Sequence, residues 1–204
     1  MRRTGAVGSD HHQQSTAQHL TRMLDLHIDQ LGGAYFRFFD PRVMYHLPRV
    51  LDAPQLSLLL QGIQQWVFVD WLGAYQAIQA PSVPATTPRL LVSPQQWQAL
   101  GDIEAFNRLL SKQRRRQQPP SHAQVPLWLN HLQSARLRGL RQPDDIAHWA
   151  ALCLAHGEPW QTHPQLNDVL QLVIHDGIPL KDALDDLLNL SLDPAEAAVP
   201  TLDD

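Results

Sequence analysis

The chain has 204 residues, 44% of them hydrophobic and 18% charged, and its formal net charge is -4. This length suits one medium domain or two small lobes, with enough residues for a hydrophobic core. The mild negative charge provides no overall attraction to nucleic acid or to an anionic membrane. The one cysteine, Cys153, rules out an internal disulfide framework and fits a reducing compartment.

The residues that follow the N-terminal Met-Arg-Arg are polar, so we expect no signal peptide. No stretch approaches the roughly 20 apolar residues that cross a bilayer, and we therefore expect a cytoplasmic protein that does not enter a membrane. Residues 1–16 are expected to be disordered because they are polar. A short helix should follow, with Leu20, Met23 and Leu24 at helical spacing, before a turn at Gly32-Gly33.

The aromatic stretch from Tyr35 to Phe39 predicts a β-strand. Alternation along a strand would place Phe36 and Phe38 on one face, which we expect to be core. Tyr35, Arg37 and Phe39 would lie on the other face. We expect this second face to be covered in part, because its charge lies between two aromatic rings.

Two helices are predicted after this strand. Asp40-Pro41 indicates the start of the first, because Asp caps a helix N-terminus and Pro fits the first helical position. Asp52 opens the second helix, with leucines along one side. Two hairpin strands are expected next, at 66–70 and 74–78. A proline-rich loop at 80–88 and a last short strand at 89–92 complete this half.

From Ser93 the pattern becomes helical, because Ser93-Pro-Gln-Gln96 combines a cap, a first-turn proline and a capping-box glutamine. Further helices are expected at 125–138, 143–157, 166–175 and from 179. The sequence therefore predicts an α+β fold, in which a small mixed α/β N-terminal lobe with a short sheet is followed by an all-helical C-terminal lobe. We expect a disordered start at 1–16 and the α/β lobe at 17–92. The helical lobe should follow at 93–190, with an acidic tail at 191–204.

The eleven histidines and the acidic residues do not form a recognisable catalytic or metal-binding pattern. The sequence contains no His-Glu-x-x-His, no Gly-rich phosphate loop and no Gly-x-Ser-x-Gly elbow. Asp144-Asp145 and Asp185-Asp186 are neighbours in sequence, so on a helix they point to different sides and are interpreted as solvated faces. Cys153 lies in an apolar helical context and is interpreted as a core residue. We expect no catalytic residue, no metal and no cofactor.

Residues Lys112 to Arg116 form the one strongly basic run. A solvated helix end explains it, because cations complement the negative end of the helix dipole. No aromatic residue is interleaved, as binding of single-stranded nucleic acid would favour. Contact with an acidic protein surface and contact with nucleic acid both stay open as alternatives.

The block Tyr35-Phe-Arg-Phe-Phe-Asp-Pro-Arg-Val43 resembles the effector adaptor (chaperone) family of bacterial type VI secretion, called Tap or Tec. The resemblance continues through a leucine-rich helix, an apolar helix and a strand that begins with Trp66. The C-terminal part of the family's sequence pattern is matched more loosely, at 135–140, 145–146 and 160–164. Altogether the resemblance spans about residues 19 to 175.

This resemblance implies a non-catalytic adaptor that binds a toxin effector and helps to load it onto the VgrG spike, with no nucleic acid or membrane as a partner. Asp40 is expected to cap a helix and to pair with Arg37 or Arg42. The motif residues are interpreted as mainly structural, with direct partner contact as the alternative, and they are Tyr35, Phe36, Arg37, Phe38, Phe39, Asp40, Pro41 and Arg42.

Members of the family usually begin with further strands ahead of this block, whereas here a polar segment and one short helix are predicted. We therefore expect the N-terminal lobe to be incomplete at its start, with a sheet edge that a partner strand could cover. Two other functions are weighed against the adaptor. One is a hydrolase-like enzyme with an unrecognised site, and the other is a nucleic-acid-associated helical protein that uses residues 112–116.

Overall fold

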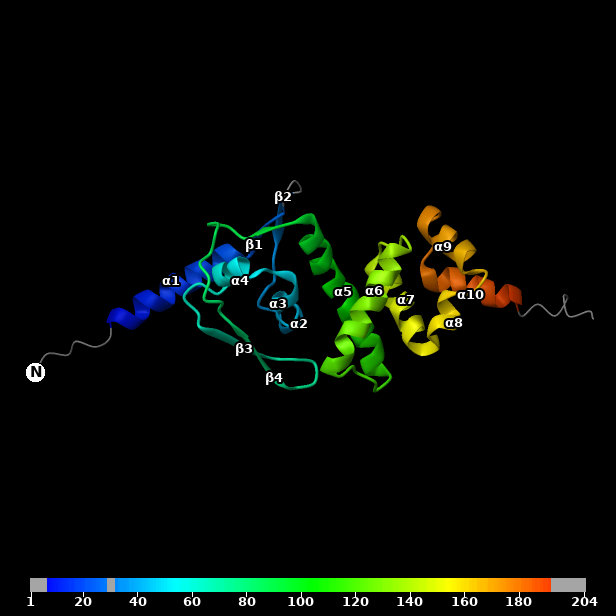
Figure 1. Ribbon diagram of the computed structural model, residues 1–204, viewed down its shortest axis with the longest axis horizontal. Helices are drawn as coiled ribbons and strands as arrows, with labels where there is room; N and C mark the ends of the chain where they lie inside the picture. Colours follow the sequence, from blue (N-terminus) through cyan, green and yellow to red (C-terminus); the bar gives the residue numbers. More distant parts are fainter. Residues whose placement is uncertain (1–6, 29–31, 192–204) are drawn as a thin grey trace, which may run out of the picture. The chain divides into compact units, whose positions relative to one another are not determined.

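The computed structural model describes residues 7–28 and 32–191, apart from the side chains of residues 7–14, 158–159 and 186–191. Short sheets occupy the first part of the chain and helices dominate the rest, so the predicted α+β class is confirmed (Figure 1). The chain divides into two compact units, with the boundary between Asn107 and Arg108. This boundary falls within helix α5 (Pro94–Arg115), whereas the sequence places it before Ser93.

A three-stranded sheet of order β2-β1-β5 organises the first unit. Strand β1 (Asp25–Ile28) pairs antiparallel with β2 (Gly32–Tyr35) and parallel with β5 (Leu91–Val92). Leu26 and Ile28 alternate with polar residues along β1 and are buried, as expected of a strand with one face in the core. Only a polar segment and one short helix were expected ahead of the motif. The structure adds strand β1 there, which was not predicted.

The predicted strand over Tyr35–Phe39 is wrong, because β2 ends at Tyr35. The backbone N–H of Phe36 still donates to the Leu24 carbonyl at 2.7 Å, and the chain then turns at Phe38 and Phe39. The predicted turn at Gly32-Gly33 is wrong as well, since both glycines belong to β2. Residues 29–31, between the two strands, lie outside the described residues.

Helix α1 (Val7–Met23) is longer than the short helix expected around Leu20. Residues 7–16, which were expected to be disordered, form its first part, and residues 1–6 lie outside the described residues. The helix is fastened to the unit by its C-terminal half. His19 Nε2 lies 3.3 Å from the carbonyl oxygen of Leu59, and the side chain of Met23 is buried in the core.

Three short helices follow the aromatic segment, and the first of them begins within the motif: α2 (Pro41–Met44), α3 (Leu47–Val50) and α4 (Ala53–Leu59). The predicted start at Asp52 is confirmed by a complete capping box. The Asp52 carboxylate accepts from Gln55 N–H at 2.8 Å, and the Gln55 side chain accepts from Asp52 N–H at 2.8 Å. Two donors at the helix start are thereby satisfied reciprocally.

The predicted hairpin is confirmed as β3 (Gln65–Val69) and β4 (Tyr75–Gln79), which pair antiparallel around Gly73. Gly73 has φ +78°, a conformation that favours glycine. Phe68 and Ile78 point inward and are buried. The core of this unit combines leucines of α4, phenylalanines of the motif and residues of both sheets.

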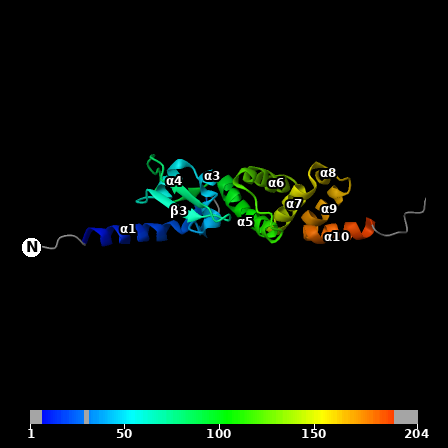
Figure 2. The ribbon, with the colours of Figure 1, turned by 90° about the horizontal axis from the view of Figure 1, so that it is seen from below.

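The second unit contains helices only, within the described residues. The predicted helices are confirmed as α6 (Val125–Leu137), α7 (Pro143–His156), α9 (Leu166–His175) and α10 (Leu180–Ser191). A 3-10 turn (His122–Gln124) and the short α8 (Glu158–Gln161) were not predicted. Helices α6 and α7 pack along each other, and α9 packs against α10 (Figure 2). The expected acidic tail lies outside the described residues from 192 onward.

Trp149 of α7 lies at the centre of the second unit and is fully buried. Its Nε1–H donates to Ser134 Oγ at 2.9 Å, and the Arg138 guanidinium lies 4.8 Å from its ring centroid. Gly139 ends α6 with φ +96°, and a Cβ at this position would lie 2.8 Å from Ile174 Cδ1. The positive φ is the reason for glycine at this position, because a Cβ would only displace the end of the exposed Ile174 side chain of α9.

Candidate protein-docking surface

Asp40 joins the end of the aromatic segment to α2. It occupies the N-cap with extended backbone, and its Oδ1 accepts from Arg42 N–H at 3.0 Å. Pro41 holds the first helical position, where the missing N–H costs no hydrogen bond. The predicted strand-to-helix corner is thus a turn-to-helix corner, with the predicted cap in place.

The Asp40 carboxylate also holds the guanidinium of Arg42. Arg42 Nε donates to Oδ1 at 3.0 Å and Nη2 donates to Oδ2 at 2.6 Å, while Arg37 Nη2 lies 3.9 Å from Oδ2. The hydrogen bonds from the Arg42 side chain hold the pKa of Asp40 below its usual value, against the opposing effect of burial. Of the two predicted partners, Arg42 forms the close, two-point contact and Arg37 the long one.

The motif separates into a buried and an exposed set of side chains. Phe36 and Phe38 are buried, as predicted, and their ring centroids are 6.0 Å apart. Tyr35 is 69% exposed and Phe39 43% exposed, and Arg37 is exposed too, so the expectation that this second set is covered in part is wrong. Exposed aromatic and arginine side chains are the types enriched at protein interfaces.

The β3–β4 hairpin carries a second exposed apolar surface in the same unit. Along both strands, buried or half-buried residues alternate with exposed ones, so one face of the two-stranded sheet points outward. Val69 lies opposite Tyr75, and Val67 opposite Ala77. We call this surface the outward hairpin face, and it consists of Gln65, Val67, Val69, Tyr75, Ala77 and Gln79.

Asp70 holds the tip of this hairpin in one conformation. Its buried carboxylate accepts from Leu72 N–H at 2.8 Å and Ala74 N–H at 3.0 Å, and from the Gln76 side chain at 2.8 Å. Three donors on one carboxylate make the turn rigid. The turn was predicted at Gly73, but the sequence pattern assigned Asp70 only to the end of a strand, and its three bonds to residues 72, 74 and 76 were not predicted.

Aromatic contacts connect the motif corner to the hairpin. Phe38 meets Trp66 of β3 edge to face, with ring centroids 5.7 Å apart. Tyr45, directly after α2, meets Trp71 of the hairpin tip at 4.4 Å. These edge-to-face pairs add to the free energy of burying the rings. Buried Phe38 of the motif and half-buried Tyr45 beyond it therefore pack against the hairpin.

The cysteine and the neighbouring acidic residues of α7 take part in packing, hydrogen bonding and ion pairing. Burial raises the pKa of the Cys153 thiol to about 11, so the thiol is protonated at neutral pH and a poor nucleophile. The interpretation of Asp145 as solvated is wrong: it is buried and accepts from Leu180 N–H at 2.8 Å, which fastens α10 to α7. Asp144 is exposed and pairs with Arg108.

No group of three His, Cys, Asp or Glu side chains that could hold a metal ion occurs among the described residues. In the same part of the chain, no helix combines the length and the apolar character needed to cross a membrane.

Comparison with known families gives one match. Residues 1–58 match the family DUF4123, described as a domain of unknown function. The matched segment contains the whole motif from Tyr35 to Val43 and ends within α4, so it includes neither the hairpin nor the helical unit. The DUF4123 family is associated with type VI secretion effector adaptors. No curated protein and no solved structure matches the chain.

Proposed function

We propose that this chain is a non-catalytic, cytoplasmic adaptor that binds a type VI secretion toxin effector and helps to load it onto the VgrG spike. The observation that carries the proposal is the Asp40-centred corner, which lies in the segment that matches DUF4123. The association of that family with effector adaptors supports the adaptor role.

The exposed side chains of the first unit support a docking role in physical terms. Tyr35 and Phe39 present aromatic rings to solvent, and Phe39 directly precedes the Asp40–Arg42 pair in the chain. Val67, Val69 and Tyr75 form an apolar row on the outward hairpin face, and Tyr75 is 82% exposed. Single exposed apolar residues are common, but a row on adjacent strands is a typical feature of interaction surfaces.

Co-purification tests the proposal. The tagged chain is expressed together with a VgrG protein and a type VI toxin effector of the same genome, and the products are analysed by size-exclusion chromatography with light scattering. A stable complex with defined stoichiometry is expected with the toxin, and a ternary complex when VgrG is added. A chain that elutes alone in the presence of both proteins would overturn the adaptor role.

A further inference from the structure

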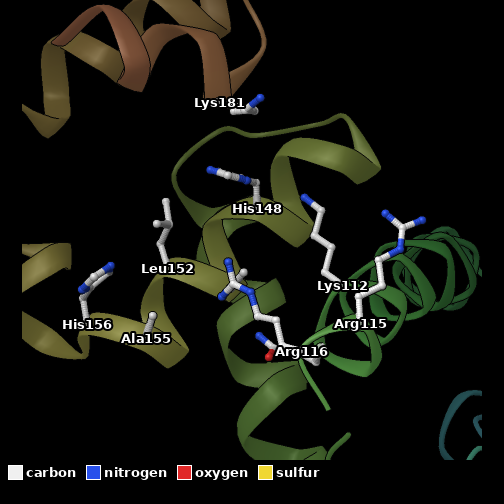
Figure 3. A pocket seen from close by; sticks show the side chains of 10 residues that line it. Lys112, Arg115, Arg116, His148, Leu152, Ala155, His156 and Lys181 are labelled. Carbon is white, nitrogen blue, oxygen red and sulfur yellow. The ribbon is translucent and has the colours of Figure 1, made fainter. Parts of the chain in front are cut away.

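A cavity in the helical unit collects positive charge from three helices (Figure 3). It is open to solvent and has a volume of about 400 Å³. The C-terminal end of α5, the middle and end of α7 and the first turn of α10 contribute to it. Its lining includes no carboxylate, and its basic side chains are Lys112, Arg115, Arg116, His148, His156 and Lys181.

The lysine and arginine side chains of this cavity form no ion pair within the described part of the chain, although Asp144 and Asp145 are near enough to act on Lys112 and Asp145 and Asp185 on His148. Arg115, Arg116 and Lys181 are exposed, and no described carboxylate lies within ion-pair distance of them or of Lys112. Burial lowers the pKa of Lys112, the charges of Asp144 and Asp145 oppose this shift, and the neighbouring arginines reinforce it. An anion in the cavity would relieve the repulsion among these cations.

The cavity also has an apolar floor. Ala151, Leu152 and Ala155 of α7 line it between the basic side chains. Figure 3 shows Lys112 and Arg116 extending from α5 toward this part of α7, with Lys181 above it. A cationic rim over aliphatic carbon atoms suits a ligand that joins anionic groups to an aliphatic body, as Asp, Glu and Leu side chains do in an acidic peptide.

Nucleic acid fits this surface less well. Among the residues that line the cavity there is no Phe, Tyr or Trp, so the large rings on which successive bases stack are missing from its wall. The chain as a whole is negatively charged, which opposes a long polyanion. A cavity of about 400 Å³ accommodates a few side chains, whereas single-stranded nucleic acid needs a groove that follows its backbone.

We propose that this cavity binds an acidic peptide segment of a partner protein. Carboxylates of the segment would contact Lys112, Arg116 and Lys181, and an aliphatic side chain would lie against Leu152. The inference rests on the proposed function only for the origin of the segment, which would belong to a protein that the adaptor carries.

Fluorescence anisotropy with the full chain tests the proposal. The probe is a fluorescein-labelled peptide that alternates Asp and Glu with Leu. Arg116→Glu on α5 and Lys181→Glu on α10 should each weaken peptide binding by about tenfold or more. Arg114→Glu is the matched control, since Arg114 belongs to the same basic run but does not line the cavity. It should change the affinity by about twofold or less, and circular dichroism should show all three variants folded.

Several results would overturn the proposal. These are absence of peptide binding to the unsubstituted chain, equal losses in all three variants, and equal binding of a peptide with Asn and Gln in place of Asp and Glu. Displacement of the peptide by oligothymidine or inorganic phosphate at lower concentration than by unlabelled peptide would assign the cavity to phosphate groups instead. The assay contains neither effector nor spike, so its failure is distinguishable from failure of the co-purification.

Discussion

Arg42 donates two side-chain hydrogen bonds to the Asp40 carboxylate, from Nε at 3.0 Å and from Nη2 at 2.6 Å, while the same carboxylate caps α2. The two-point contact fixes the direction of the guanidinium although that side chain is 63% exposed. One acidic residue therefore ends the aromatic segment, starts a helix and orients an arginine at the surface.

Asp40→Ala should lower the free energy of unfolding by about 1–2 kcal/mol, because the cap is lost. Asp40→Asn should cost less, since the amide oxygen can still accept from Arg42 N–H while the charge is removed. Arg42→Ala should cost under about 1 kcal/mol, because the Arg42 side chain is 63% exposed and solvent screens its charge. Urea denaturation of the three variants measures these differences. An Asn variant as unstable as the Ala variant would contradict capping as the main role.

Val67→Lys combined with Tyr75→Lys should abolish co-purification with the effector or spike while the chain stays folded. Both residues are exposed, so the change in unfolding free energy should stay within about 1 kcal/mol. The measurement is pull-down yield alongside thermal unfolding.

Ile78→Ala, on the inward side of the same hairpin, provides the opposite case. It should cost about 2–5 kcal/mol of stability because Ile78 is buried. Unchanged complex formation by the double lysine variant would remove the outward hairpin face from the docking surface.

Asp145→Ala should detach the start of α10, because the buried Leu180 N–H would lose its acceptor. An unsatisfied buried donor costs about 1–3 kcal/mol. Hydrogen exchange should become faster in α10, with little change in the β3–β4 hairpin. Asp144→Ala is the control, since Asp144 is exposed; equal effects of the two substitutions would contradict the assigned role of Asp145.

The chain should lose stability as the pH falls from about 6.5 to about 4, partly through His46. Burial lowers the pKa of His46 to about 4, with a further contribution from Arg49. In this range the unfolded chain binds a proton at His46 that the folded chain does not, so stability is complete above pH 6.5 and decreases below it. The shift corresponds to about 3 kcal/mol at pH 4.

Thermal unfolding measured at intervals between pH 8 and pH 4 checks this pH dependence. His46→Gln should be less stable at pH 8, because the ring contact with Phe106 at 4.7 Å is lost, but its stability should fall less steeply with pH. Parallel pH profiles of the two proteins would show that other groups cause the loss.

Features encoded by neighbouring residues were predicted well. The caps at Asp40, Asp52 and Ser93 are confirmed, because a cap depends on residues two or three positions away. The helices of the second unit were recognisable from long runs with helical spacing, as was the hairpin from two apolar strands around Gly73.

Features that depend on distant residues were missed. Strand β1 has only four residues, and its parallel partner β5 lies more than sixty residues later. The aromatic segment was assigned to a strand because rings favour strands. The chain turns there instead, since Asp40 N–H bonds to the Arg37 carbonyl at 3.1 Å. The cationic cavity likewise requires Lys181 beside Arg116, and no local pattern brings these residues together.

The alternation along β3 and β4 assigns folding and recognition to different positions of the same two strands. Phe68 and Ile78 hold the hairpin against the core, whereas Val67 and Tyr75 contribute only to its outer face. The outer positions can therefore diverge in evolution without loss of the fold. A library randomised at 65, 67, 69, 75, 77 and 79 offers a route to redirect the protein toward a new cargo.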